Sequence, residues 1–237
     1  MKTLTIIMML ALSLVADNIL ETIDRKLTPT SAQMYKKLIN IEPDGTKKEF
    51  LLFQVKKDKD KMVSLFLAPD SEKGRSTLRL GDNMWLYIPN VGRAIRITSM
   101  QSVVGGVFNN ADIMRLDFST EYDVAKQEEK ENHILLDLKA KNDTVSYDRL
   151  LMQVDKKTLT PLQIECYTST KMLIKTLYYK KIKDFGDNIV RPSVIETNSP
   201  MYKGYKSIMI YGKITPKDIK DEAFTLDNLS NVSELRR

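Results

Sequence analysis

The sequence is poor in the side chains on which most catalytic and metal sites depend. It has one histidine, one cysteine and one tryptophan in 237 residues. A single cysteine excludes an internal disulfide. No Gly-x-Ser-x-Gly, phosphate-binding loop, dinucleotide-binding or His-Glu-x-x-His motif occurs. We therefore expect no cofactor, no metal and no catalytic residue. An enzyme that uses a pair of carboxylates stays a minor alternative.

The two rarest side chains lie in alternating, strand-like sequence. His133 has no neighbouring Ser, Cys or metal-ligand pattern, so we interpret it as a half-exposed strand residue. Cys166 alternates in step with Leu162 and Ile164, which favours a small buried hydrophobe over a nucleophile.

Long hydrophobic runs are lacking except at the N-terminus. Residues 1–16 carry Lys2 and then an apolar run, too short for a membrane-spanning helix and typical of a secretory signal peptide. Cleavage after Ser13 or after Ala16 is expected. No cysteine follows the run to carry an acyl anchor. The sequence thus predicts a soluble, exported domain over residues 17–237, in the periplasm.

The excess of positive charge is small and is spread along the chain. Lys and Arg number 37 against 31 Asp and Glu, a net charge of +6. Residues 56–61 mix both signs, and residues 179–184 alternate charged with apolar side chains, as solvated strands do. We therefore expect no nucleic-acid partner. Transient contact with anionic lipid remains open.

Apolar residues recur with a period of two through most of the chain, after one short amphipathic helix over residues 17–27. Strand-like segments follow one another across short turns, without any strand–helix–strand rhythm. This pattern predicts a mainly β fold with one curled antiparallel sheet, an unclosed β-barrel of about 10–12 strands. Short helices are expected at its mouth. No linker or repeat divides the domain.

One connector departs from the charged composition of the chain. Residues 97–111 carry no charge, although 29% of all residues are charged. The connector is either a buried crossover or a lid, and the sequence supports both interpretations equally. In the second, Val103, Val104, Val107 and Phe108 cover the mouth of the sheet, and Gly105 and Gly106 form the hinge.

The strands carry more apolar side chains than a sheet with one buried face requires. In residues 50–55 both faces are apolar, and methionines are frequent. An inner cavity would use this excess. The candidate cavity residues are Phe53, Leu65, Trp85, Tyr87, Met152 and Ile164.

Several segments resemble one known family. They are 81-GDNMWLYIPNVGRAIRI-97, 107-VFNNADIMRLDFSTEYDV-124, 155-DKKTLTPLQIECY-167, 191-RPSVIET-197 and 222-EAFTLDNL-229. Their order and spacing resemble the outer-membrane lipoprotein-sorting (LolA-like) family, and most closely its branch associated with membrane exporters. The resemblance covers nearly all of residues 17–237.

The resemblance implies an unclosed barrel with a helical lid over an apolar cavity that receives acyl chains. It further implies a soluble periplasmic carrier of lipoprotein acyl chains or another lipid, between an inner-membrane exporter and an outer-membrane acceptor. Arg75, Arg93 and Arg96 are candidates for an arginine that contacts the lid. Two alternatives remain: a lipid-sensing or protein-interaction module in envelope signalling, and an enzyme acting on lipid or glycan.

Overall fold

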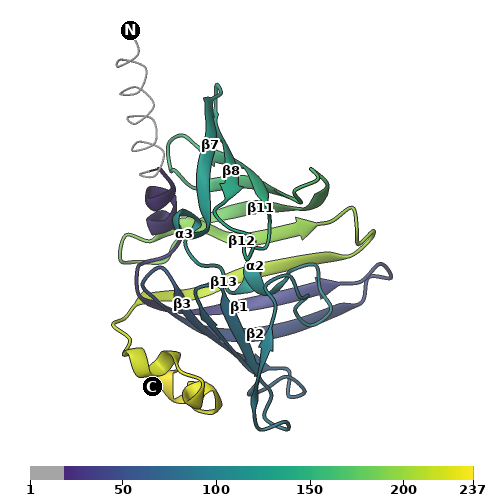
Figure 1. The fold of residues 1–237 in the computed structure, drawn as a ribbon, viewed down its shortest axis with the longest axis vertical. Helices are drawn as coiled ribbons and strands as arrows, with labels where there is room; N and C mark the ends of the chain where they lie inside the picture. Colours follow the sequence, from purple (N-terminus) through teal and green to yellow (C-terminus); the bar gives the residue numbers. More distant parts are fainter. Residues whose placement is uncertain (1–18, 237) are drawn as a thin grey trace.

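All strands of the protein belong to one antiparallel sheet. The computed structural model describes residues 19–236, and within them the sheet has 13 strands in the order β6-β5-β4-β3-β2-β1-β13-β12-β11-β10-β9-β8-β7. The edge strands β6 and β7 do not pair with each other, so the sheet is curled but unclosed (Figure 1). The predicted fold is confirmed, with one strand more than the expected upper number.

The strand bounds follow the predicted alternation closely. The strands are β1 (Ala32–Ile41), β2 (Lys47–Lys57), β3 (Lys61–Ala68), β4 (Ser76–Leu80), β5 (Asn83–Tyr87), β6 (Ala94–Ile97), β7 (Tyr122–Glu129), β8 (His133–Ala140), β9 (Arg149–Asp155), β10 (Pro161–Tyr167), β11 (Leu173–Asp184), β12 (Val190–Asn198) and β13 (Lys206–Pro216).

Helices are short and cover both faces of the sheet. Residues 19–27 are helical. Between β6 and β7 lie α2 (Asn110–Ile113) and α3 (Phe118–Glu121). The described residues end in two 3-10 helices, η1 (Asp221–Phe224) and η2 (Asp227–Arg236). None of the helices among the described residues has the length and apolar character needed to cross a membrane.

Two apolar clusters divide the sheet into an inner and an outer face. The inner cluster joins the helix at residues 19–27 and the β6–β7 connection to strands β1–β3 and β7–β13. The outer cluster joins η1 and η2 to strands β2, β3 and β4. Strand β2 is therefore buried on both sides, which explains why residues 50–55 are apolar on both faces. The predicted signal peptide and its cleavage site lie outside the described residues.

Candidate functional site

One segment crosses the inner face from one edge of the sheet to the other. Residues 98–121, the covering segment, leave edge strand β6 and enter edge strand β7, and α2 and α3 lie in front of the sheet (Figure 1). Its apolar side chains Val103, Phe108, Ile113 and Phe118 are buried in the inner cluster. The uncharged connector is therefore packed against the sheet, because the face beneath it is apolar.

The part of the covering segment that carries the two glycines folds into a tight loop. Val104 and Gly105 have positive φ angles of 47° and 74°, and Ser102 Oγ donates to the Gly106 carbonyl at 2.7 Å. Gly106 has no room for a side chain, since a Cβ atom there would overlap the side-chain amide of Asn40. Gly105 thus serves the turn, whereas Gly106 serves close packing onto β1.

Side chains from the sheet satisfy the backbone of this loop. Asn40 Nδ2 of β1 donates to the Val104 carbonyl at 3.2 Å. Ser207 Oγ of β13 accepts from the Val107 amide at 2.8 Å and donates to Asn40 Oδ1 at 2.8 Å. Lys175 Nζ of β11 donates to the Val107 carbonyl at 2.5 Å. A buried loop is tolerated here because polar side chains replace the missing ladder partners.

Three further inner-face side chains bind the carbonyls at the end of α2. Lys36 Nζ donates to the Ile113 carbonyl at 3.2 Å, and Gln54 Nε2 donates to the same oxygen at 3.0 Å. Arg79 Nη1 donates to the Met114 carbonyl at 3.0 Å. These bonds satisfy carbonyls that a helix end leaves unpaired.

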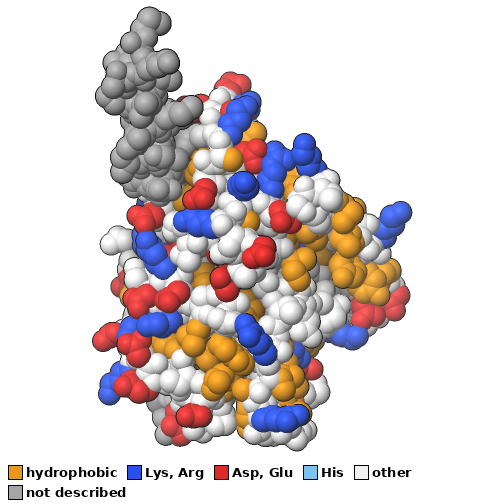
Figure 2. Space-filling model, viewed as in Figure 1, with side chains coloured by type: hydrophobic (Ala, Val, Ile, Leu, Met, Phe, Trp, Pro, Cys, Tyr) orange, Lys and Arg blue, Asp and Glu red, His pale blue; other side chains and the backbone are white. Residues whose placement is uncertain are grey.

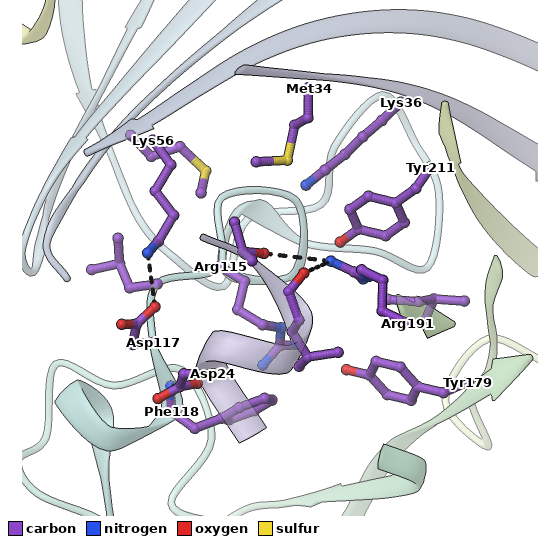
Figure 3. A pocket seen from close by; sticks show the side chains of 15 residues that line it. Asp24, Met34, Lys36, Lys56, Arg115, Asp117, Phe118, Tyr179, Arg191 and Tyr211 are labelled. Atoms are coloured by element: carbon purple, nitrogen blue, oxygen red, sulfur yellow. Dashed lines mark hydrogen bonds and ion pairs between the residues drawn. The ribbon is translucent and has the colours of Figure 1, made fainter. Parts of the chain in front are cut away.

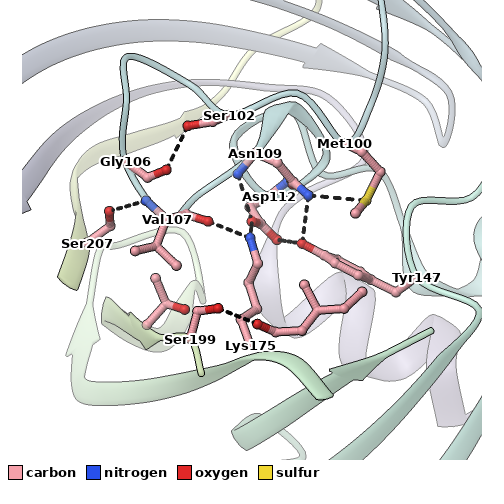
Figure 4. A network of polar contacts seen from close by, with 12 residues as sticks. Met100, Ser102, Gly106, Val107, Asn109, Asp112, Tyr147, Lys175, Ser199 and Ser207 are labelled. Atoms are coloured by element: carbon pink, nitrogen blue, oxygen red, sulfur yellow. Dashed lines mark hydrogen bonds and ion pairs between the residues drawn. The ribbon is translucent and has the colours of Figure 1, made fainter. Parts of the chain in front are cut away.

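Asp112 is the centre of the polar network that anchors α2 (Figure 4). Its Oδ2 accepts from Lys175 Nζ at 2.8 Å and from the Asn109 amide at 3.0 Å. Its Oδ1 accepts from Tyr147 Oη at 3.0 Å and lies 3.5 Å from Arg115 Nη2. The side chain of Asp112 is only 1% exposed. The pair with Lys175 therefore latches the covering segment onto β11 without contact with bulk water.

The helix α3 is anchored by a second set of buried charges. Asp24, from the helix at residues 19–27, accepts from the Phe118 and Ser119 amides at 2.7 and 3.0 Å. Asp117 forms an ion pair with Lys56 Nζ at 2.9 Å and a second ion pair with Arg25 of the helix at residues 19–27. The N-terminal helix and the covering segment thus form one roof over the inner face.

A small cavity lies beneath this roof and is enriched in positive charge (Figure 3). Its volume is about 30 Å³, enough for a water molecule or two and too small for an acyl chain. Lys36, Arg115 and Arg191 line it together with Tyr179 and Tyr211. Figure 3 shows these side chains converging from β1, β11, β12, β13 and the covering segment.

The carboxylates at the cavity have partners already. Both Asp24 and Asp117 line it, but the first caps α3 and the second holds Lys56. Burial raises the pKa of Asp24, and the backbone amides of α3 oppose that shift. A carboxylate held in this way is poorly placed to exchange protons with a ligand, so the pair is better explained as structural.

A cleft with exposed methionines opens beside the covering segment. Its volume is about 150 Å³, and it is lined by Gly106 and Val107 on one side and by Met172 and Met201 on the other. These two methionines are 50% and 56% exposed. Figure 2 shows hydrophobic side chains gathered at several places on the face that carries the covering segment. Flexible methionines at such a cleft suit contact with variable apolar ligands.

The structure separates the residues predicted for the cavity into two groups. Met152 and Ile164 lie in the inner cluster, together with Val103 and Phe108 of the predicted lid, while Val104 packs against it. Val107 is buried beside them. The other four lie in the outer cluster against η1 and η2: Phe53, Leu65, Trp85 and Tyr87. Their role in binding stays a prediction.

The buried cations of the inner face were not predicted from the sequence. The arginine that bonds to the covering segment from the sheet is Arg79, whereas Arg75 bonds to Glu72 and Arg96 to Asn83. The signal in the sequence that could have found them is a charged residue that shares a strand face with buried apolar residues. Such residues are Lys36 between Met34 and Leu38, Lys56 after Leu52, and Lys175 before Leu177.

Comparisons with known proteins agree with this architecture. A family model described only as an uncharacterized protein matches residues 58–231. A LolA superfamily protein from Nitrosomonas europaea is 25% identical, with a TM-score of 0.80 over 90% of this chain and 98% of that one. No curated protein matches the chain.

Two further solved structures share the fold. A domain described as an outer membrane lipoprotein-sorting protein, from Vibrio parahaemolyticus, is 17% identical with a TM-score of 0.75, covering 92% of this chain and 99% of that one. A DUF1329 family protein from Desulfovibrio piger is 20% identical with a TM-score of 0.77, covering 92% and 98%. The chain therefore belongs to the matched family of uncharacterized proteins, and its structural neighbours confirm the predicted resemblance to the LolA-like fold.

Proposed function

We propose that this protein is a periplasmic carrier that binds the acyl chains of a lipoprotein or lipid on the inner face of its sheet and delivers them towards the outer membrane. The observation that supports it most directly is the covering segment, whose apolar side chains occupy the inner face where a chain would bind. Likeness to an outer-membrane lipoprotein-sorting domain supports the same proposal. An inner-membrane exporter and an outer-membrane acceptor are the partners it implies.

Binding requires the covering segment to move, because the cavity beneath it holds no more than a water or two. An acyl chain of roughly 14–16 carbons gains on the order of 10 kcal/mol on leaving water. Displacing Val103 and Phe108 from the inner cluster offsets part of that gain. The affinity is thereby kept moderate, which allows release to an acceptor that binds the chain more tightly.

The methionine-lined cleft is the entrance in this mechanism. It touches the covering segment at Gly106 and Val107, the loop that must move first. Met172 and Met201 on its rim present apolar, adaptable surface to an arriving chain. A chain can therefore begin to bury itself before the covering segment is fully displaced.

Native mass spectrometry of protein purified from an envelope extract, followed by lipid analysis of what dissociates, tests the carrier function. We expect an acyl-bearing adduct, and uptake of a fluorescent fatty acyl probe by lipid-free protein. Met201→Glu should slow this uptake. Val91→Glu is the matched control, because Val91 is 50% exposed and does not line the cleft. Protein that carries no lipid and takes up no probe would refute the proposal.

A further inference from the structure

The cavity beneath the roof contains more positive charge than its carboxylates neutralise. Lys36 is 3% exposed and Arg191 is 1% exposed, yet neither forms an ion pair with a carboxylate of the described residues, in contrast to Lys56 and Lys175. Buried charges without a counter-ion are unfavourable and rarely kept for stability alone.

The present partners of these two cations are neutral. Lys36 Nζ donates to the Ile113 carbonyl at 3.2 Å and lies 4.8 Å from the centre of the Tyr211 ring. Arg191 donates to the Leu27 and Pro192 carbonyls and stacks 3.9 Å above the same ring. An ammonium has three N–H donors and a guanidinium has five, so both cations can donate further.

A buried hydroxyl in the same cavity has no hydrogen-bond partner among the described residues. Tyr179 is 6% exposed, and its Oη forms no hydrogen bond in the part of the chain that the structure describes. The hydroxyl turns into the cavity that Lys36 and Arg191 line (Figure 3). An unpaired buried hydroxyl costs stability, and this position is one where a ligand oxygen would satisfy it.

We propose that the cavity between Lys36, Arg191 and Tyr179 binds the oxyanion, phosphate or carboxylate, of an acyl-bearing ligand. This inference rests on the proposed carrier function and names the head group of its cargo. Apolar side chains of Met34, Met62 and Ile195 line the same cavity, so a chain attached to the oxyanion continues directly into apolar surroundings. At about 30 Å³ the closed cavity has room only for water, so the head group binds there once the covering segment has moved.

The electrostatics of Tyr211 support the assignment. Burial raises the pKa of this phenol, but the charges of Lys36 and Arg191 outweigh burial and lower its pKa to about 8. The pKa of Lys36 is lowered by burial and by the charge of Arg191. Both directions indicate a site that favours added negative charge. A bound oxyanion would reverse them.

Matched amphiphiles test the inference on the full mature chain. Oleoyl lysophosphatidic acid and monoolein share their chain and differ by a phosphate, and oleate and oleyl alcohol differ by a carboxylate. We expect the anionic member of at least one pair to bind about tenfold more tightly, and to raise the pKa of Tyr211 in an absorbance titration. Inorganic phosphate alone is the third arm.

Two variants and one control locate the effect. Lys36→Met should abolish the preference for the anionic member. Tyr179→Phe should reduce the preference severalfold without loss of stability, since its hydroxyl has no partner to lose. Tyr167→Phe is the control, because the Tyr167 hydroxyl bonds to Glu165 and does not line the cavity.

The outcomes separate the inference from the function on which it rests. Equal binding of the anionic and neutral members in both pairs would overturn the oxyanion site and leave the carrier intact. Failure of all four amphiphiles would overturn the carrier and the inference together. If inorganic phosphate binds although none of the four amphiphiles does, the site binds a free anion and not the head group of a lipid.

Discussion

Replacement of Lys175 by Met should loosen the latch between the covering segment and β11. Lys175 and Asp112 are buried, with side chains 4% and 1% exposed, and their N···O distance is 2.8 Å. Removing one partner of such a pair costs about 3–5 kcal/mol. We expect the lower end of this range, because Asp112 keeps its bonds from Tyr147 and the Asn109 amide and methionine keeps the apolar stem.

The effect on ligand binding should have the opposite sign. If the chain binds only when the covering segment is displaced, about 3 kcal/mol lost from the closed state raises the apparent acyl affinity, by up to about 100-fold. Urea unfolding measures the stability, and titration with a fluorescent fatty acid measures the affinity. Native-state hydrogen exchange should show residues 102–109 opening more easily.

Lys180→Met is the matched control on the same strand. Lys180 Nζ lies 2.9 Å from a Glu196 carboxylate oxygen, a distance close to that of the buried pair, but its side chain is 47% exposed. Exposed ion pairs typically contribute only about 0.2–1 kcal/mol to the free energy of unfolding. If Lys175→Met loses stability and gains no affinity, the covering segment is a fixed part of the core. If Lys175→Met behaves like Lys180→Met in both assays, the buried pair does not hold the covering segment on β11.

Four further predictions test other parts of the structure. The pKa of Tyr211 is lowered from 10.0 to about 8, so the folded state stabilises the ionised phenol. The contribution of this ionisation to the free energy of unfolding is complete above pH 10 and is lost as pH falls through 8. Relative to Tyr211→Phe, urea unfolding should show a difference on the order of 2–3 kcal/mol over this range. Gly106→Ala should cost about 1–3 kcal/mol, because its Cβ displaces Asn40. Phe108→Ala, at a fully buried position, should cost about 3–5 kcal/mol in the same assay. Trp85→Ala should lower thermal stability and leave acyl binding per folded molecule unchanged, because Trp85 packs in the outer cluster.

The sheet was predictable because its alternation is local. In β1 the buried and part-exposed residues alternate without exception over Ala32–Ile41, and a period of two shows this directly in the sequence. Both apolar faces of β2 were also visible. What covers each face was not, because η1 and η2 lie far along the chain from β2. The cavity residues were assigned without that knowledge, so Phe53 and Trp85 were grouped with Met152.

The buried cations were harder to recognise because charge usually marks a solvated face. Lys36 follows Met34 and precedes Leu38 on one face of β1, so the phase of the strand places it inside. Its partner, the Ile113 carbonyl, is far away in sequence. A charged residue in phase with buried ones becomes interpretable only when the element it bonds to is known.

The two interpretations of the uncharged connector are compatible in the structure. Val103 and Phe108 are buried as in a crossover. The backbone of the loop that carries them is bonded to side chains of the sheet, however, and these hydrogen bonds can break one at a time. Full removal of the covering segment would leave Gln54, Arg79 and Lys36 without the carbonyls that they bind. An acyl chain offers no acceptor to replace those carbonyls. Displacement limited to residues 102–109, with the end of α2 kept in place, avoids most of this cost. A cargo with an oxyanion beside Lys36 would offset the remainder.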